Sequence, residues 1–91
     1  EDAFYTKLDE NNFLFDGKTS LKDFYRVLAV PEDVEEHFEK IRGESETLAG
    51  FLLELIEAFP EKKQVIPFEN YTFTIEDIDK KRIKQLKVTI K

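Results

Sequence analysis

The spacing of apolar residues changes twice along this chain, and the two changes limit the folds that it can adopt. Both ends carry the alternation of apolar and polar residues that is typical of strands, whereas the middle carries apolar residues at helical intervals. Pro31 and Pro60 lie in the middle part, where a proline can start a helix or must stop one. Separate runs of strands and helices favour the α+β class, with an antiparallel sheet and helices on one face.

The N-terminal part predicts a hairpin. Residues 3–8 read as a strand, residues 9–12 as a turn in which Asn tolerates positive φ, and residues 13–15 as a second strand that ends at Asp16-Gly17.

Three helices are predicted to follow. The first starts at Ser20, a capping residue, and the second starts at Pro31 and ends before Gly43. The third covers residues 47–58 and is the most regular. Its helically spaced apolar residues are Leu48, Phe51, Leu52, Leu55, Ile56 and Phe59.

The remainder predicts three strands, which gives the order ββααα-βββ. Pro67 confines residues 65–68 to an edge or an irregular strand, because proline cannot donate to a ladder. Apolar and polar residues alternate again over residues 71–76, which predicts a strand, and a charged loop is predicted over residues 77–81. The last strand runs to Ile90, and the wrong parity of Ile83 predicts a bulge near Lys84-Gln85.

Composition narrows the function classes. The chain has 91 residues, the length of one domain, and a net charge of −6, which disfavours binding to nucleic acid. It has no stretch of the roughly 20 apolar residues that a membrane helix needs, so a soluble domain is expected. Because methionine is absent, we expect residues 1–91 to be one domain excised from a larger protein.

Enzymatic activity is not expected, since no nucleophile and base can be paired. The single histidine, His37, lies near the edge of a helical stripe and is interpreted as partly exposed and without function. Gly50 falls inside the third helix, where glycine costs about 1 kcal/mol relative to alanine. Either close packing or the close approach of a ligand would explain it.

Asp77 and Asp79 are weak candidates for a metal site, because hard cations prefer oxygen ligands. The alternative is a solvated hairpin tip, whose charge Lys80, Lys81 and Arg82 balance.

The order of several short motifs resembles the CorC/HlyC-type transporter-associated domain over nearly the whole chain. The third helix begins with Thr-Leu-Ala-Gly and is followed by Phe-Pro, an aromatic strand and a final Arg-Ile strand. An Asp-Gly turn and a Ser-Leu helix start match in the first half. The residues of these motifs, taken as structural markers, are Gly17, Thr47, Leu48, Gly50, Pro60, Arg82 and Ile83. The chain also resembles a related group of the family that is associated with gliding motility.

This resemblance implies a location and a role. Such domains lie at the C-terminal end of membrane proteins that also carry a transmembrane domain and a pair of CBS domains. They face the cytoplasm at the inner membrane. Their parents are linked to magnesium and cobalt efflux or to haemolysin-like names. The implied function is non-enzymatic regulation through contacts with the CBS domains of the same chain, with a second copy, or with a small ligand.

The alternative that the resemblance leaves open is a nucleotide- or flavin-binding module, because the same fold occurs as a subdomain of certain FAD-binding enzymes. No cofactor is otherwise expected, and FAD or an adenine nucleotide is implied by the fold alone. The chain departs from the family at Glu57, where glycine is common, and at Lys63-Gln64, where a Gly-Glu turn is common.

Overall fold

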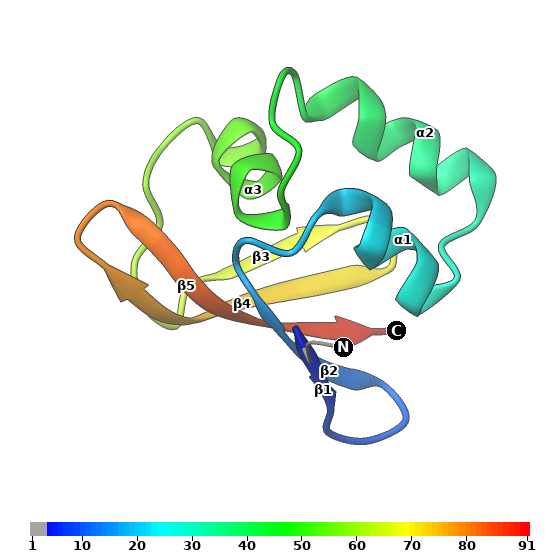
Figure 1. The fold of residues 1–91 in the computed structure, drawn as a ribbon, viewed down its shortest axis with the longest axis horizontal. Helices are drawn as coiled ribbons and strands as arrows, with labels where there is room; N and C mark the ends of the chain where they lie inside the picture. Colours follow the sequence, from blue (N-terminus) through cyan, green and yellow to red (C-terminus); the bar gives the residue numbers. More distant parts are fainter. Residues whose placement is uncertain (1–3) are drawn as a thin grey trace.

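The strands form one antiparallel sheet in the order β1-β2-β5-β4-β3 in the computed structural model, which describes residues 4–91. The predicted order of elements is confirmed. The elements are β1 (Tyr5–Lys7), β2 (Asn12–Asp16), α1 (Leu21–Leu28), α2 (Glu32–Ile41), α3 (Leu48–Ile56), β3 (Val65–Phe68), β4 (Tyr71–Asp79) and β5 (Arg82–Ile90). All three helices cover the same face of the sheet (Figure 1). Ala3, which the sequence assigned to the first strand, lies outside the described residues.

The last strand is the centre of the sheet. β5 pairs with β2 on one side and with β4 on the other, so the two ends of the chain meet in adjacent strands. β3 lies at an edge, as Pro67 required, because it pairs with β4 alone.

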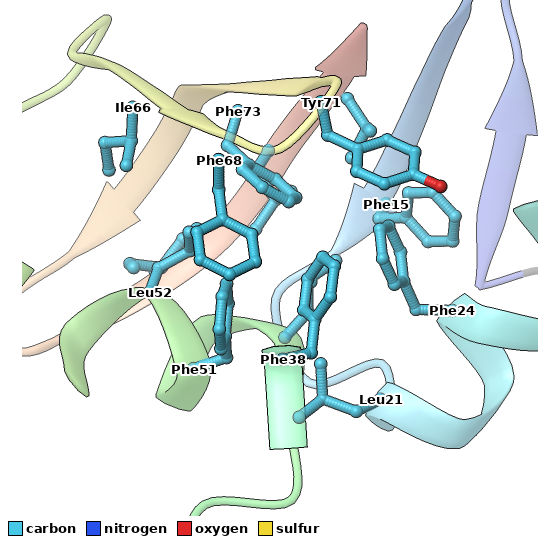
Figure 2. Close-up of a cluster of buried hydrophobic side chains, with 14 of the residues drawn as sticks. Phe15, Leu21, Phe24, Phe38, Phe51, Leu52, Ile66, Phe68, Tyr71 and Phe73 are labelled. Carbon is cyan, nitrogen blue, oxygen red and sulfur yellow. The ribbon is translucent and has the colours of Figure 1, made fainter. Parts of the chain in front are cut away.

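An aromatic cluster fills the space between the helices and the sheet (Figure 2). Phe38 of α2 is fully buried, and its ring centroid lies 4.6 Å from that of Phe51 and 4.8 Å from that of Phe68. Phe24 of α1 lies 5.5 Å from Phe38 and 5.5 Å from Phe15 of β2. Edge-on and tilted packing of this kind is what the ring quadrupoles favour. A few large aromatic rings from the helices and from the sheet therefore give this short chain a continuous core.

The hairpin between β4 and β5 is longer than predicted. Asp77 and Asp79 belong to β4, and Lys80 and Lys81 alone remain in the turn, where a five-residue loop was expected. The ladder continues because Ile78 pairs with Ile83, which is buried. The predicted bulge is confirmed, since the register shifts on both sides of the pair that Asp77 makes with Gln85.

The third helix is shorter than predicted. It ends at Ile56 because Glu57 takes a left-handed conformation with φ of 57°. Phe59, assigned to the buried stripe, therefore lies beyond the helix and is 41% exposed. Lys63 is also left-handed, with φ of 72°. Glu57 and Lys63, the two positions where the family often has glycine, are thus both positions where glycine would be the least strained residue.

Candidate functional site

A hollow of about 440 Å³ lies where three segments of the chain meet: the turn after β2, the first turn of α3 and the tip of the β4–β5 hairpin. We call it the basic hollow. Its lining residues are Asp16, Gly17, Lys18, Thr47, Ala49, Gly50, Leu53, Lys81, Arg82, Ile83 and Lys84.

Backbone hydrogen bonds hold the three segments together. The Gly17 amide donates to the carbonyl of Lys84 at 2.9 Å, and the Gly17 carbonyl accepts from the amide of Ala49 at 2.9 Å. The Leu48 amide donates to the carbonyl of Thr19 at 2.8 Å. The turn after β2 thus joins β5 to the start of α3 and fixes the walls of the hollow.

The amides at the start of α3 are already used. Besides those of Leu48 and Ala49, the Gly50 amide donates to the side-chain oxygen of Thr47 at 3.0 Å, which is an N-cap. A ligand in the hollow would therefore be held by side chains and not by the free amide donors that many helix starts offer.

Both glycines of the hollow are explained by packing. A Cβ at Gly17 would lie 2.0 Å from the carbonyl oxygen of Ile83, and a Cβ at Gly50 would lie 2.7 Å from the Cβ and Oγ of Ser45. Gly50 also lies in the first turn of α3, not in its interior as predicted. Close packing is therefore the better of the two explanations that the sequence left open for Gly50.

The charge of the basic hollow is opposite to that of the chain. Four cationic residues line it, Lys18, Lys81, Arg82 and Lys84, against one acidic residue, Asp16. The apolar part of the lining comes from Ala49, Leu53 and Ile83. Sequence reasoning missed these cations as a group, because it treated Lys81 and Arg82 as balancing neighbouring acids. The signal was present in the sequence, where four of the five residues from 80 to 84 are basic in an otherwise acidic chain.

Five of the seven motif residues taken as structural markers line this hollow: Gly17, Thr47, Gly50, Arg82 and Ile83. Leu48 is instead fully buried in the core, and Pro60 is buried just after α3. Most of the motif residues, which are far apart in the sequence, therefore lie together around the basic hollow.

Asp77 and Asp79 do not line the hollow. The carboxylate of Asp79 lies 4.0 Å from the guanidinium of Arg82. Among residues 4–91, no three His, Cys, Asp or Glu side chains are grouped as a metal ion would require. Metal binding by this pair stays a prediction.

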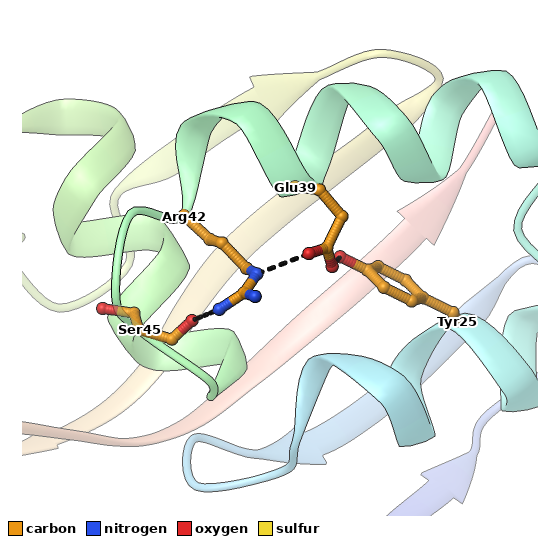
Figure 3. A network of polar contacts seen from close by, with 4 residues as sticks. All are labelled: Tyr25, Glu39, Arg42 and Ser45. Atoms are coloured by element: carbon orange, nitrogen blue, oxygen red, sulfur yellow. Dashed lines mark hydrogen bonds and ion pairs between the residues drawn. The ribbon is translucent and has the colours of Figure 1, made fainter.

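A second polar cluster joins α1, α2 and the loop after α2 (Figure 3). The Tyr25 hydroxyl donates to Glu39 at 2.7 Å, and Arg42 donates to Glu39 at 2.6 Å and to the carbonyl of Ser45 at 2.7 Å. Burial, and then the hydrogen bond to Glu39, raise the pKa of Tyr25. Partial burial by itself raises the pKa of Glu39, but hydrogen bonds from Arg42 and Tyr25 outweigh it and lower that pKa below 4.5.

Tyr25→Phe tests this cluster. At neutral pH the lost hydrogen bond should lower the free energy of unfolding by about 1 kcal/mol. Because folding raises the pKa of Tyr25, the unfolded chain loses this proton first as the pH rises above 10.0, so wild-type stability should fall there. The variant should lose less stability over the same pH range. Some loss will remain, because burial also raises the pKa of Tyr71. Urea unfolding at pH 7 to 11 measures both effects, and parallel pH profiles would contradict the assignment.

His37 belongs to α2 and contacts the end of β3 and the turn that follows it. Its side chain is 47% exposed, as expected of a partly exposed helical histidine. Its ring is in contact with Phe68, at 4.5 Å between centroids, and its Nδ1 lies 2.5 Å from a carboxylate oxygen of Glu69. His37 therefore helps to fasten α2 to the sheet, a role that the sequence did not suggest.

Comparison with known proteins points to one family. The profile described as the Transporter associated domain, CorC_HlyC, matches residues 6–91. The polyamine export protein of Escherichia coli K12 is 38% identical over 81 residues, which are 89% of this chain and 17% of that protein. The chain thus spans about a sixth of the length of this relative. No helix among residues 4–91 has the length and apolarity needed to cross a membrane.

Solved structures agree with the sequence match. The transporter-associated domain of a CBS domain protein from Porphyromonas gingivalis has a TM-score of 0.79 and 28% identity, covering 97% of this chain and 98% of that chain. The Mg²⁺ and Co²⁺ transporter-associated region from Neisseria meningitidis has a TM-score of 0.81 at 13% identity, covering 98% and 100%. The second likeness shows the fold alone. The chain belongs to the CorC/HlyC family of transporter-associated domains.

Proposed function

We propose that this domain is a non-enzymatic regulatory and interaction domain of a membrane transporter that moves a cationic cargo. The observation that carries the proposal is the match of the transporter-associated domain family to residues 6–91. The name of the E. coli relative refers to polyamine export, and the family resemblance implies efflux of Mg²⁺ and Co²⁺. These cargoes share positive charge, so the proposal is stated for cations and includes the efflux of Mg²⁺ and Co²⁺.

The proposed partners are the CBS domains of the same polypeptide at the cytoplasmic face of the membrane, or a second copy of the domain. Among residues 4–91, four large apolar side chains are at least 37% exposed, in or beside the two edge strands and after α3, and are available to a protein partner: Tyr5, Leu8, Phe59 and Val65. Such residues anchor many interfaces when a partner covers them.

Domain exchange in the E. coli polyamine export protein tests this function. Three versions are compared: the intact protein, one that lacks its own transporter-associated domain, and one that carries residues 6–91 of this chain instead. We expect deletion to change the rate of labelled spermidine export severalfold, and the exchange to restore it towards the intact value.

The amount of each version in the membrane is measured in parallel, so that a loss of protein is not mistaken for a loss of regulation. An export rate that is unchanged by deletion, at every cargo concentration, would overturn the regulatory role. The same cells loaded with Co²⁺ show whether the effect extends to a divalent cargo.

A further inference from the structure

We propose that the basic hollow is a binding site for a small phosphate-bearing anion. The first step is the sorting of charge around it. The β4–β5 hairpin carries both signs, but its acids Glu76, Asp77 and Asp79 do not line the hollow, whereas Lys81, Arg82 and Lys84 do. The acids precede the turn on β4 and the bases lie in the turn or follow it, so the side of the hairpin that borders the hollow is the basic one.

The second step is that most cations of the hollow lack acidic partners within the described part of the domain. Lys18, Lys81 and Lys84 form no ion pair with any residue between 4 and 91 that the structure describes. Arg82 has Asp79 at 4.0 Å, at the limit of an ion pair, and both side chains are largely exposed. The cations come from two separate segments, which backbone hydrogen bonds hold around one space. An anion placed there would reduce their mutual repulsion.

The third step concerns the class of anion. A volume of about 440 Å³ falls within the usual range for small-molecule sites. Lysine and arginine are the usual side-chain partners of phosphate, and a phosphate carries more than one negative charge and three acceptor oxygens. Ala49 and Leu53, which are half-buried, add apolar surface that could receive an uncharged part of the ligand. A single carboxylate would leave most of the cations unpaired.

The cationic cargo of a transporter would be repelled by this site, so the hollow is not a cargo site. The phosphate could come from a soluble molecule such as a nucleotide or from the headgroup of a lipid. In both cases the chemistry recognised is the same, and binding would give the domain a signal distinct from the cargo. This inference is independent of the proposed regulatory role.

Calorimetric titration of the 91-residue chain with pyrophosphate tests the site, because relatives of the same extent have been solved as separate chains. The titration is done at low salt and compared with sodium chloride at equal ionic strength. Lys81→Gln/Lys84→Gln removes two cations of the hollow. Lys62→Gln/Lys80→Gln is the matched control, since it removes the same charge from exposed lysines that do not line the hollow.

We expect pyrophosphate to bind with a Kd below about 1 mM, tenfold or more weaker binding in Lys81→Gln/Lys84→Gln, and a change within about twofold in the control. Equal weakening in both variants would show general charge attraction and would overturn the site. No saturable binding of pyrophosphate, ATP or vesicles containing phosphatidic acid would also overturn it. Binding of ATP supports a soluble source, and binding of the vesicles alone, lost in the same variant, supports a lipid source.

A negative titration would leave the domain-exchange experiment unaffected, because that experiment measures export and uses no phosphate ligand. The two proposals can therefore fail separately.

Discussion

Replacing Phe38 by alanine is expected to lower the free energy of unfolding by about 3–5 kcal/mol, the usual cost of removing a buried phenylalanine. Of the ten residues of α2, Phe38 alone is fully buried, so most of the docking of that helix depends on one ring. Globular domains are stable by about 5–15 kcal/mol, so this loss is a large part of the total for a short chain. Urea unfolding followed by circular dichroism measures the change.

Phe59→Ala is the matched control, because the same side chain is removed from a site that is 41% exposed. It should cost no more than about 1 kcal/mol, as is usual for surface substitutions with partial burial. If Phe38→Ala cost no more than Phe59→Ala, α2 would not be packed on the sheet as described.

The sequence predicts most of this fold because its local signals agree with one another. The apolar spacing around Phe24 and Phe51, the cap at Ser20 and the parity change at Ile83 each mark a feature that the structure contains. These signals act over a few residues, and the covalent chain presents them directly.

Two parts of the predicted fold failed, one at the end of a helix and one at a strand pairing. α3 stops at Ile56 although residues 57–59 could continue its pattern, because Glu57 turns the chain into the left-handed region. The β4–β5 ladder continues into the expected loop by three pairs, and the middle one, between Ile78 and Ile83, buries Ile83. Neither event has a local signal in a single sequence.

The basic hollow was beyond prediction for the same reason. Lys18 and Lys84 are 66 positions apart in the printed sequence, and they line one space because Gly17 hydrogen-bonds to β5 and to α3. The motif residues were identified, but their spatial grouping depends on strand order. That order places the last strand beside β2, which sequence patterns do not specify.

Gly17→Ala is expected to destabilise the domain by about 3 kcal/mol or more, at or above the upper end of the usual cost of overpacking. A Cβ there would lie 2.0 Å from the carbonyl oxygen of Ile83 and 3.3 Å from the Cβ of Ala49. Because the first obstacle is backbone, relief requires β5 to move. That movement would strain the 2.9 Å hydrogen bonds that Gly17 makes with Lys84 and Ala49.

Gly50→Ala is the comparison that separates a backbone obstacle from a side-chain obstacle. Its Cβ would lie 2.7 Å from the side chain of Ser45, which Ser45→Gly removes. We therefore expect Ser45→Gly to recover most of the stability lost in Gly50→Ala and none of that lost in Gly17→Ala. Thermal unfolding of the single and double variants gives the coupling directly. If Gly17→Ala remained within about 1 kcal/mol of wild type, the close approach of the turn to β5 would be contradicted, because an added Cβ could not fit there without moving backbone.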